Sequence, residues 1–198
     1  IGTSDDAELA LRSSALTALV NVADLDNREA LLQLALNGEL MRGQAVFIRA
    51  AAAQSFAMLS QPGDLVRYDE LLSATEDPTT LAELQNYRAP IEIVAEGCAH
   101  DLACLTGLLS HENFLVREKA IFDLARFVDN PAAGGAALLD GLSTVPAQSR
   151  DALFRQLRHA TLPQTAGETV DNLLEELSGP SNRDLRHLLK MLRETDIE

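Results

Sequence analysis

The residue types best suited to chemistry in this sequence gather between positions 98 and 111. Cys98 and Cys104 are the two cysteines of the chain, His100 lies between them, and His111 follows closely. A structural zinc site needs four ligands at a recognisable spacing. Cys-x-His-x3-Cys matches no such module, so we expect no metal. These residues support one of two hypotheses for function, namely an enzyme or small-molecule-binding protein whose pocket lies near Cys98 and His100.

Simpler chemistry can also explain the two cysteines. We expect Cys98 to end one helix and Cys104 to lie in the first turn of the next helix. A disulfide between them would then close a tight turn, as in a protein exported to an oxidising compartment. Two buried, unreactive thiols are the other interpretation. The sequence favours the thiols, because cysteine is among the most frequently buried residues.

Motifs of catalysis do not occur elsewhere in the sequence. It has no Gly-rich phosphate loop, no Gly-x-Ser-x-Gly nucleophile motif and no His-Glu-x-x-His zinc motif. His159 and His187 each follow an arginine, without a serine or cysteine partner in a suggestive motif. We therefore expect a protein that is not an enzyme and that uses no cofactor.

Helices are the elements expected to position these residues. Hydrophobic residues make up 46% of the 198-residue chain and are mostly Ala and Leu, with no Trp and 4% aromatic residues. Ala and Leu are strong helix formers, whereas strands favour β-branched and aromatic side chains. The composition therefore predicts an all-α fold with a continuous core.

A short pattern recurs along the chain. It consists of an arginine, a small or apolar residue about three positions later, and a large apolar residue seven positions later. The spacing of the copies, roughly 30–40 residues, fits a repeat of two helices. The copies are Arg12–Ala15–Leu19, Arg49–Ala52–Phe56, Arg117–Ala120–Leu124, Arg150–Leu153–Leu157 and a degenerate one at Arg88–Ile91–Ala95.

Leucine-rich segments between these copies predict a second helix for each pair. They lie at 31–35, 102–109, 138–142 and 170–177, and a closing helix is expected from Arg183 to Glu194. Each pair has too little apolar surface to be stable alone, so stacking of pairs must supply the core.

Capping residues and turn-forming Pro and Gly residues lie where this arrangement needs helix starts and turns. Helix starts are predicted by the cap residues Asp26, Asp77 and Asn130. Turns are predicted at Pro62-Gly63, Gly134-Gly135 and Gly179-Pro180. Residues 73–90 are the least regular stretch, where we expect a longer loop or a distorted repeat.

Segments 47–59 (FIRAAAAQSFAML) and 114–127 (FLVREKAIFDLARF) resemble the second helix of bacterial HEAT repeats. The mark of that family is a Val-Arg or Ile-Arg pair followed by Ala and an apolar residue, here Ile48-Arg49 and Val116-Arg117. The resemblance implies one HEAT-like repeat domain over residues 1–198. Its fold would be a right-handed α-α superhelix (solenoid) of about five helix pairs, which binds other macromolecules along its concave face. It implies no particular activity.

Two roles are open for the repeated arginines. They can line the concave face and bind a carboxylate or phosphate, or they can pair with an acid or loop carbonyl of an adjacent repeat. We expect the second role for most of them, because it is common in HEAT-like families. The hypothesis of a non-catalytic scaffold still predicts exposed arginines and aromatic rings on the inner face. The expected contacts with a partner protein are Arg49, Arg117, Phe122, Arg150, Phe154, Arg186 and Lys190.

Charge narrows the classes of partner. The chain has 30 acidic and 16 basic side chains and a formal net charge of −14, which repels a phosphate backbone, so we expect no nucleic acid as partner. The last helix carries a basic stripe, which is either a docking site or a solvated outer face. That stripe consists of Arg183, Arg186, Lys190 and Arg193.

Location is left open by the sequence. No run of 18 or more apolar residues occurs, so we expect no membrane span. The chain starts at Ile1, as would a piece of a longer protein or a mature form after signal cleavage. The compartment is therefore either the cytoplasm or, after export, the periplasm. The style of the repeats suggests a bacterial source.

Overall fold

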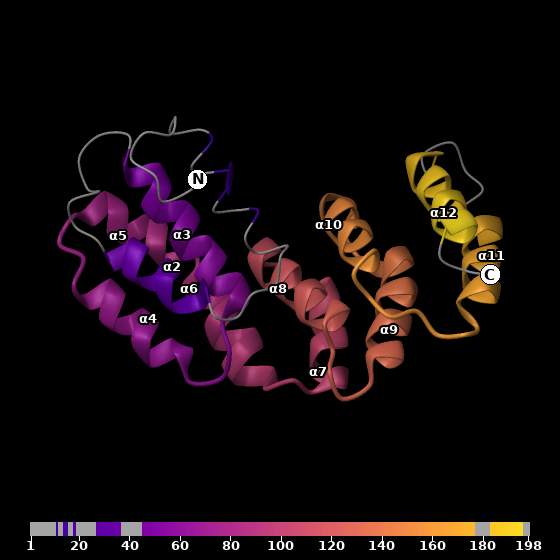
Figure 1. The fold of residues 1–198 in the computed structure, drawn as a ribbon, viewed down its shortest axis with the longest axis horizontal. Helices are drawn as coiled ribbons and strands as arrows, with labels where there is room; N and C mark the ends of the chain where they lie inside the picture. Colours follow the sequence, from indigo (N-terminus) through magenta and orange to yellow (C-terminus); the bar gives the residue numbers. More distant parts are fainter. Residues whose placement is uncertain are drawn as a thin grey trace. The chain divides into compact units, whose positions relative to one another are not determined.

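The computed structural model describes residues 27–36, 45–176 and 183–195, with isolated positions between 11 and 18 (Figure 1). All regular structure in these residues is helical, which confirms the all-α fold class. None of the described helices is long and apolar enough to cross a membrane. The α-helices are α2 (Asn27–Leu36), α3 (Ala45–Leu59), α4 (Asp64–Ser73), α5 (Pro78–Gln85), α6 (Arg88–Pro90), α7 (Leu102–Gly107), α8 (Phe114–Ala125), α9 (Pro131–Thr144), α10 (Ala147–Leu157), α11 (Ala166–Glu176) and α12 (Arg183–Thr195).

The chain divides into two compact units. Unit 1 comprises Ile1–Ala99 and unit 2 comprises His100–Glu198. A π-helical segment (Ile91–Glu96) follows α6 in unit 1, and a 3-10 turn (Leu108–Ser110) follows α7 in unit 2. The expectation of a single repeat domain over residues 1–198 stays a prediction.

The core of unit 1 forms around α3, whose alanine-rich face is buried. Ile48 and Ala52 are fully buried, and Phe56 stacks on Tyr68 of α4 with 6.0 Å between the ring centroids. The Tyr68 hydroxyl donates a hydrogen bond to the carbonyl oxygen of Leu84 in α5 at 2.8 Å, so the polar end of this buried ring has a partner. Small residues on α3 let α2 and α5 pack closely against it.

The stretch over 73–90 is mostly helical. Only residues 74–77 separate α4 from α5. Asp77 starts the new helix, since its side chain accepts a hydrogen bond from the Thr80 N–H at 2.7 Å. The prediction of a longer loop is therefore wrong. The irregularity lies further on, where the degenerate repeat copy at Arg88 leads into the π-helical segment.

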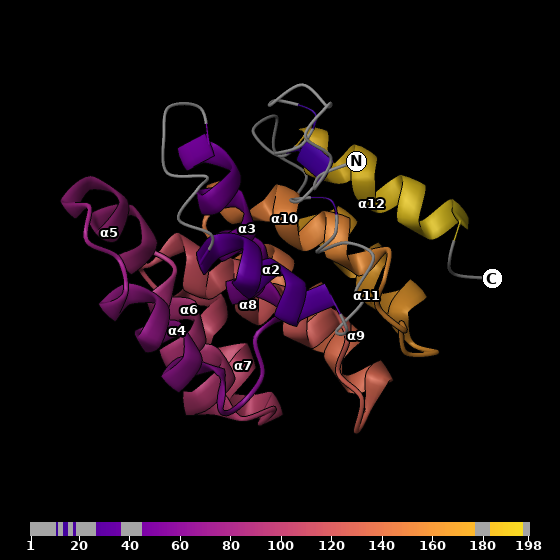
Figure 2. The same cartoon turned by 60° about the vertical axis from the view of Figure 1, so that its left-hand side comes forward.

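In the described part of unit 2 the helices follow one another in pairs, α7 with α8, α9 with α10 and α11 with α12 (Figure 1, Figure 2). α7, α9 and α11 pack against one another in chain order, and α8 packs on both α9 and α10. α12 packs on α11. We call α7, α9 and α11 the first helices of unit 2, and α8, α10 and α12 its second helices. Asp101, Asn113 and Asn130 start three of them, since each side chain accepts a hydrogen bond from a backbone N–H of the next turn.

Gly134 and Gly135 lie within α9, so the turn predicted at these residues is wrong. A side chain at Gly134 would overlap the carbonyl oxygen of Leu124, and one at Gly135 would overlap the carbonyl oxygen of Thr161. Both glycines therefore serve close packing. They let α9 approach the end of α8 and the segment after α10.

Other predictions of helix ends and turns have mixed outcomes. The turn at Pro62-Gly63 is confirmed, with Gly63 at a φ of 95° that suits glycine. The closing helix is confirmed as α12. The cap at Asp26, the turn at Gly179-Pro180 and most of the copy at Arg12 lie outside the described residues.

Close packing at Gly135 gives a first prediction. Gly135→Ala should lower the free energy of unfolding by about 2 kcal/mol, because the added methyl group meets backbone that cannot move aside easily. Gly107→Ala is the control, since a Cβ there has open space and alanine is favoured in a helix by up to about 1 kcal/mol. Urea unfolding followed by circular dichroism measures both variants. Equal stability of the two would contradict the packing role.

Candidate functional site

Arg117, the arginine of the third repeat copy, is 1% exposed. Its Nε donates to the Ser149 hydroxyl of α10 at 2.8 Å. Its Nη1 donates to the carbonyl oxygens of His111 and Glu112 in the turn before α8. The guanidinium also lies over the Phe114 ring, 5.7 Å from the centroid. Arg117 therefore ties α8 to α10 and to its own preceding turn.

Arg49 makes the matching contact in unit 1. It is 3% exposed, and its Nη2 donates to the Thr75 hydroxyl at 2.9 Å. That hydroxyl in turn donates to the Leu71 carbonyl oxygen at 2.8 Å, at the end of α4. Burial lowers the pKa of Arg49, and the nearby Tyr68 and Asp77 oppose this shift. In both repeat copies the arginine holds a buried hydroxyl from a later helix or turn, whereas the structural interpretation predicts the acid or loop carbonyl of an adjacent repeat.

Exposure was expected of four residues that the structure buries. Arg49 and Arg117 are buried for the reasons above, and this part of the prediction is wrong. Phe122 and Phe154 are each 5% exposed, because their rings turn into unit 2 and each is covered by an arginine. None of the four presents a side chain to a partner.

Three further predicted contact residues remain accessible. Arg150 and Arg186 are half-buried, and Lys190 is exposed. The Arg186 Nη1 donates to the Leu174 carbonyl oxygen at 2.6 Å, which ties α12 to α11. Of the predicted set, Lys190 is therefore the residue whose side chain is most open to a partner.

Sequence reasoning missed a pair of cation–aromatic contacts on the second helices. Arg126 stacks over Phe122 with its Cζ 3.8 Å from the ring centroid, and Arg158 lies over Phe154 at 5.8 Å. Each arginine follows its phenylalanine by four residues, the spacing at which side chains meet on a helix. This repeated Phe-x3-Arg is a signal that could have identified them. Arg126 also donates through Nη1 to the Gln156 side chain of α10 at 2.7 Å.

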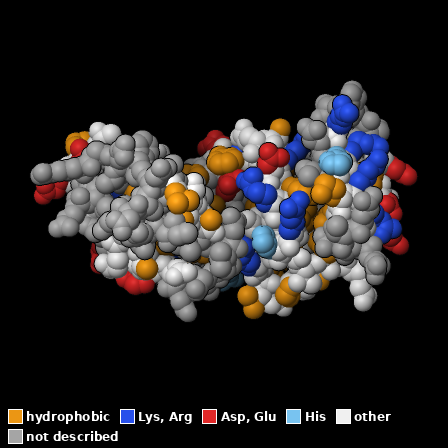
Figure 3. Space-filling model, turned by 45° about the horizontal axis from the view of Figure 1, so that its top comes forward, with side chains coloured by type: hydrophobic (Ala, Val, Ile, Leu, Met, Phe, Trp, Pro, Cys, Tyr) orange, Lys and Arg blue, Asp and Glu red, His pale blue; other side chains and the backbone are white. Residues whose placement is uncertain are grey.

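The lysines and arginines of unit 2 are confined to its second helices, whereas its acids lie on both sets of helices. Residues 100–198 contain ten Lys and Arg, and every one lies on α8, α10 or α12 or on the residue that ends α8 or α10. α7, α9 and α11 contain none, and α9 and α11 carry only acids. Lys, Arg and His side chains gather on one face of unit 2, over α10 and α12 (Figure 3). We define the basic surface as Arg126, Arg155, Arg158, Arg183 and Lys190.

One lysine of the second helices is removed from that surface. Lys119 is fully buried and pairs with Asp123 at 2.7 Å. Burial raises the pKa of the Asp123 carboxyl group, and the Lys119 ammonium opposes that shift. The pair is internal to α8, so it neither adds to nor subtracts from the charge that a partner meets.

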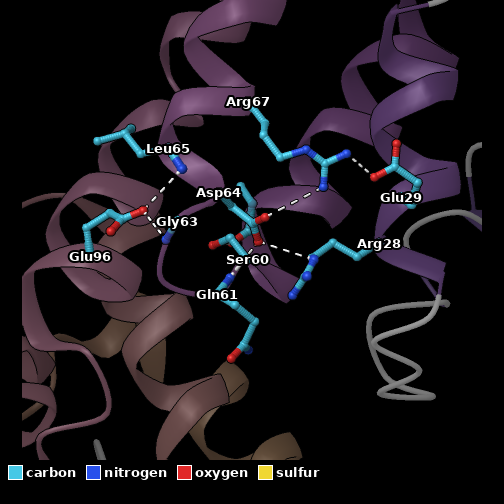
Figure 4. Close-up of polar contacts among 10 residues, drawn as sticks. Arg28, Glu29, Ser60, Gln61, Gly63, Asp64, Leu65, Arg67 and Glu96 are labelled. Atoms are coloured by element: carbon cyan, nitrogen blue, oxygen red, sulfur yellow. Dashed lines mark hydrogen bonds and ion pairs between the residues drawn. The ribbon is translucent and has the colours of Figure 1, made fainter.

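Unit 1 uses its arginines differently (Figure 4). Arg28 pairs with Asp64 at 3.2 Å, and Arg67 pairs with Glu29. Arg88 pairs with Asp69 at 2.7 Å. Glu96 accepts hydrogen bonds from the N–H groups of Gly63 and Leu65 and so holds the turn before α4. By contrast, within the described part of unit 2 no carboxylate lies within ion-pair distance of Arg126, Arg155, Arg158, Arg183 or Lys190.

Cys98 and Cys104 are both disulfide-bonded, and as the only cysteines they bond to each other. The interpretation as buried thiols is therefore wrong. Ala99 and His100 adopt positive φ values of 44° and 67°, which turn the chain sharply between the two cysteines. Asp101 then accepts a hydrogen bond from the Cys104 N–H at 2.7 Å. Cys104 thus lies in the first turn of α7, as expected.

Metal ligands do not cluster in the described residues, where no group of three or more His, Cys, Asp or Glu could hold an ion. Comparison with protein-family models, curated proteins and solved structures finds no match to this chain. Any functional conclusion therefore rests on the side chains described above.

The contact between Arg117 and Ser149 gives a second prediction. Arg117→Met keeps the aliphatic volume but leaves a hydroxyl and two carbonyls without their donor. We therefore expect the free energy of unfolding to fall by about 3 kcal/mol. A double-mutant cycle with Ser149→Ala should give a coupling energy of about 2 kcal/mol in urea unfolding. A cycle with Ser143→Ala, an exposed serine of α9, is the control and should give none. Additive effects at Ser149 would contradict the bond.

The disulfide gives a third prediction. Reduction removes a short covalent loop, so it should lower the free energy of unfolding by about 2 kcal/mol, chiefly through the entropy of the unfolded chain. Urea unfolding with and without a dithiol reductant measures the change. The Cys98→Ala, Cys104→Ala double variant should have the same free energy of unfolding as the reduced protein, and the reductant should not change it. A reductant effect that persists in that variant would show another cause.

Proposed function

We propose that this chain is a HEAT-like helical-repeat scaffold of bacterial type, without a catalytic role, that binds a partner protein. The second helices of unit 2 would supply the binding side of a right-handed solenoid. Support comes from the order of helix pairs in unit 2 and from the two matching buried arginines, Arg49 and Arg117. Such contacts between successive helices are what a stacked repeat needs, since each repeat packs only on its neighbours.

The observation that carries this proposal is the basic surface of unit 2. In a chain with a net charge of −14, cations on second helices alone form a local field of opposite sign. Stability does not require that arrangement, because exposed charges contribute little to folding. The arginines that do stabilise the fold are buried elsewhere. Binding is therefore the simplest role for the exposed cations.

The alternative function, an enzyme or small-molecule-binding protein with a pocket near Cys98 and His100, loses its main candidate nucleophile. A nucleophilic cysteine acts as a thiolate, and both cysteines are bonded in the disulfide. His100 is exposed and lies at a strained backbone position in the turn. No contact among the described residues favours a reaction there.

Site-specific photocrosslinking tests the proposed function. A benzophenone side chain at Gln148, exposed on α10, should crosslink to one partner protein in a lysate of the source organism. The same group at Asn172, exposed on α11, is the control and should not capture it. The crosslink should survive moderate salt and compete with unlabelled chain. Capture of the partner from α11 alone, or from neither helix, would refute binding through the second helices.

A further inference from the structure

The two cation–aromatic contacts lie at the carboxyl ends of α8 and α10, two helices that pack on each other. Arg126 ends α8 and Arg158 ends α10, and the bond from Arg126 to Gln156 joins the two helix ends. Arg155 is exposed on the last turn of α10. Three guanidinium groups thus lie on or next to the last turns of two second helices that pack on each other.

Arg126 is held in place before any ligand arrives. Its guanidinium stacks on Phe122 at 3.8 Å, and Nη1 is fixed by the Gln156 side chain at 2.7 Å and, more weakly, by the Phe122 carbonyl oxygen at 3.4 Å. No other nitrogen of Arg126 has a hydrogen-bond partner among the described residues. A planar fork with free donors and a fixed position suits a carboxylate, because little side-chain entropy is lost on binding.

Acids near the three arginines are not paired with them. Asp123 pairs with Lys119, and Glu118 lies near enough to Arg155 to interact with it electrostatically. Asp151 precedes Arg155 by four residues on α10, and Asp129 follows Arg126 by three. In the described residues none of these carboxylates lies within ion-pair distance of Arg126, Arg155 or Arg158, so the three guanidinium groups stay open to a ligand.

We propose that Arg126, Arg155 and Arg158 bind the carboxylates of a Glu- and Asp-rich segment of the partner protein. This inference rests on the proposed function, since it names the chemistry of the partner at the same surface. The arginine fork can take each carboxylate through two parallel hydrogen bonds. The stacked rings of Phe122 and Phe154 hold two of the three guanidiniums above the helix surface.

A short acidic segment fits this surface better than a nucleic acid does. α9 and α11 carry only acids, and α11 alone has Glu168, Asp171, Glu175 and Glu176. A long polyanion would extend beyond the arginines and meet this repulsion, and few phosphates would find a cation. A segment with a few carboxylates can stay within reach of the three arginines.

Fluorescence anisotropy of a labelled Glu-rich peptide, titrated with the full chain, tests the proposal. Arg155→Gln with Arg158→Gln should weaken binding by about three- to tenfold at low salt, and both side chains are exposed, so folding should not suffer. Arg67→Gln with Arg88→Gln, two arginines of unit 1, changes the net charge equally and should leave affinity unchanged. Arg155→Lys with Arg158→Lys keeps the charge but loses the guanidinium fork, so it should restore only part of the affinity lost in the glutamine variant. Thermal unfolding checks that all variants fold.

Three outcomes would overturn the inference. Equal loss in the Arg67 and Arg88 variant would show a general charge effect. If a Gln-rich peptide binds as tightly as the Glu-rich one, the arginines do not recognise carboxylates. Equal or tighter binding of a single-stranded oligonucleotide of the same charge would favour a different ligand.

The test separates this inference from the proposed function. If Gln148 captures a partner but the Glu-rich peptide does not bind, the second helices bind a protein of other chemistry and this inference alone fails. If the peptide fails and the crosslinks on α10 fail as well, both proposals fail.

Discussion

The packing of unit 2 depends on one buried cation, the guanidinium of Arg117. A buried charge is costly unless it is hydrogen-bonded. Here Nε and Nη1 are engaged by the Ser149 hydroxyl and by two carbonyls of the preceding turn, and the guanidinium lies over Phe114, while Nη2 has no partner among the described residues. These contacts fix the start of α8 relative to the start of α10. In unit 1 the Arg49–Thr75 contact has the same logic, with a shorter route along the chain.

Because the buried arginines stabilise each unit, the exposed arginines of the second helices are left for another role. In the described part of unit 1, Arg28, Arg67 and Arg88 are each paired with an acid. In unit 2 the cations lie on the second helices, which also carry acids such as Glu118 and Asp151, whereas the charged residues of α9 and α11 are all acids. No carboxylate in the described part of unit 2 lies within ion-pair distance of the basic surface, and the ion pairing lost there is a small cost in water.

Much of the fold was predictable because it follows from local sequence. The alanine-rich stripe of α3, the caps at Asp77 and Asn130 and the closing helix all depend on residues close in the chain. Gly134 and Gly135 were misread as a turn, since their role depends on backbone from α8 and from the segment after α10. The repeat of the arginines was visible in the sequence, but the burial of Arg49 and Arg117 could not be predicted, because their partners Thr75 and Ser149 are distant in sequence. The Phe-x3-Arg pairs were local and could have been found.

Hydrogen–deuterium exchange of the full chain, with and without the Glu-rich peptide, tests the central claim most directly. The account predicts slower exchange in residues 147–158 of α10 and its C-terminal turn, and unchanged exchange in α11 (Ala166–Glu176). Exchange reports the opening of backbone hydrogen bonds, so protection should follow the helix that the ligand holds. Protection confined to α11, or none in either helix at saturating peptide, would contradict the claim that buried arginines stabilise the fold while exposed arginines of the second helices bind the ligand.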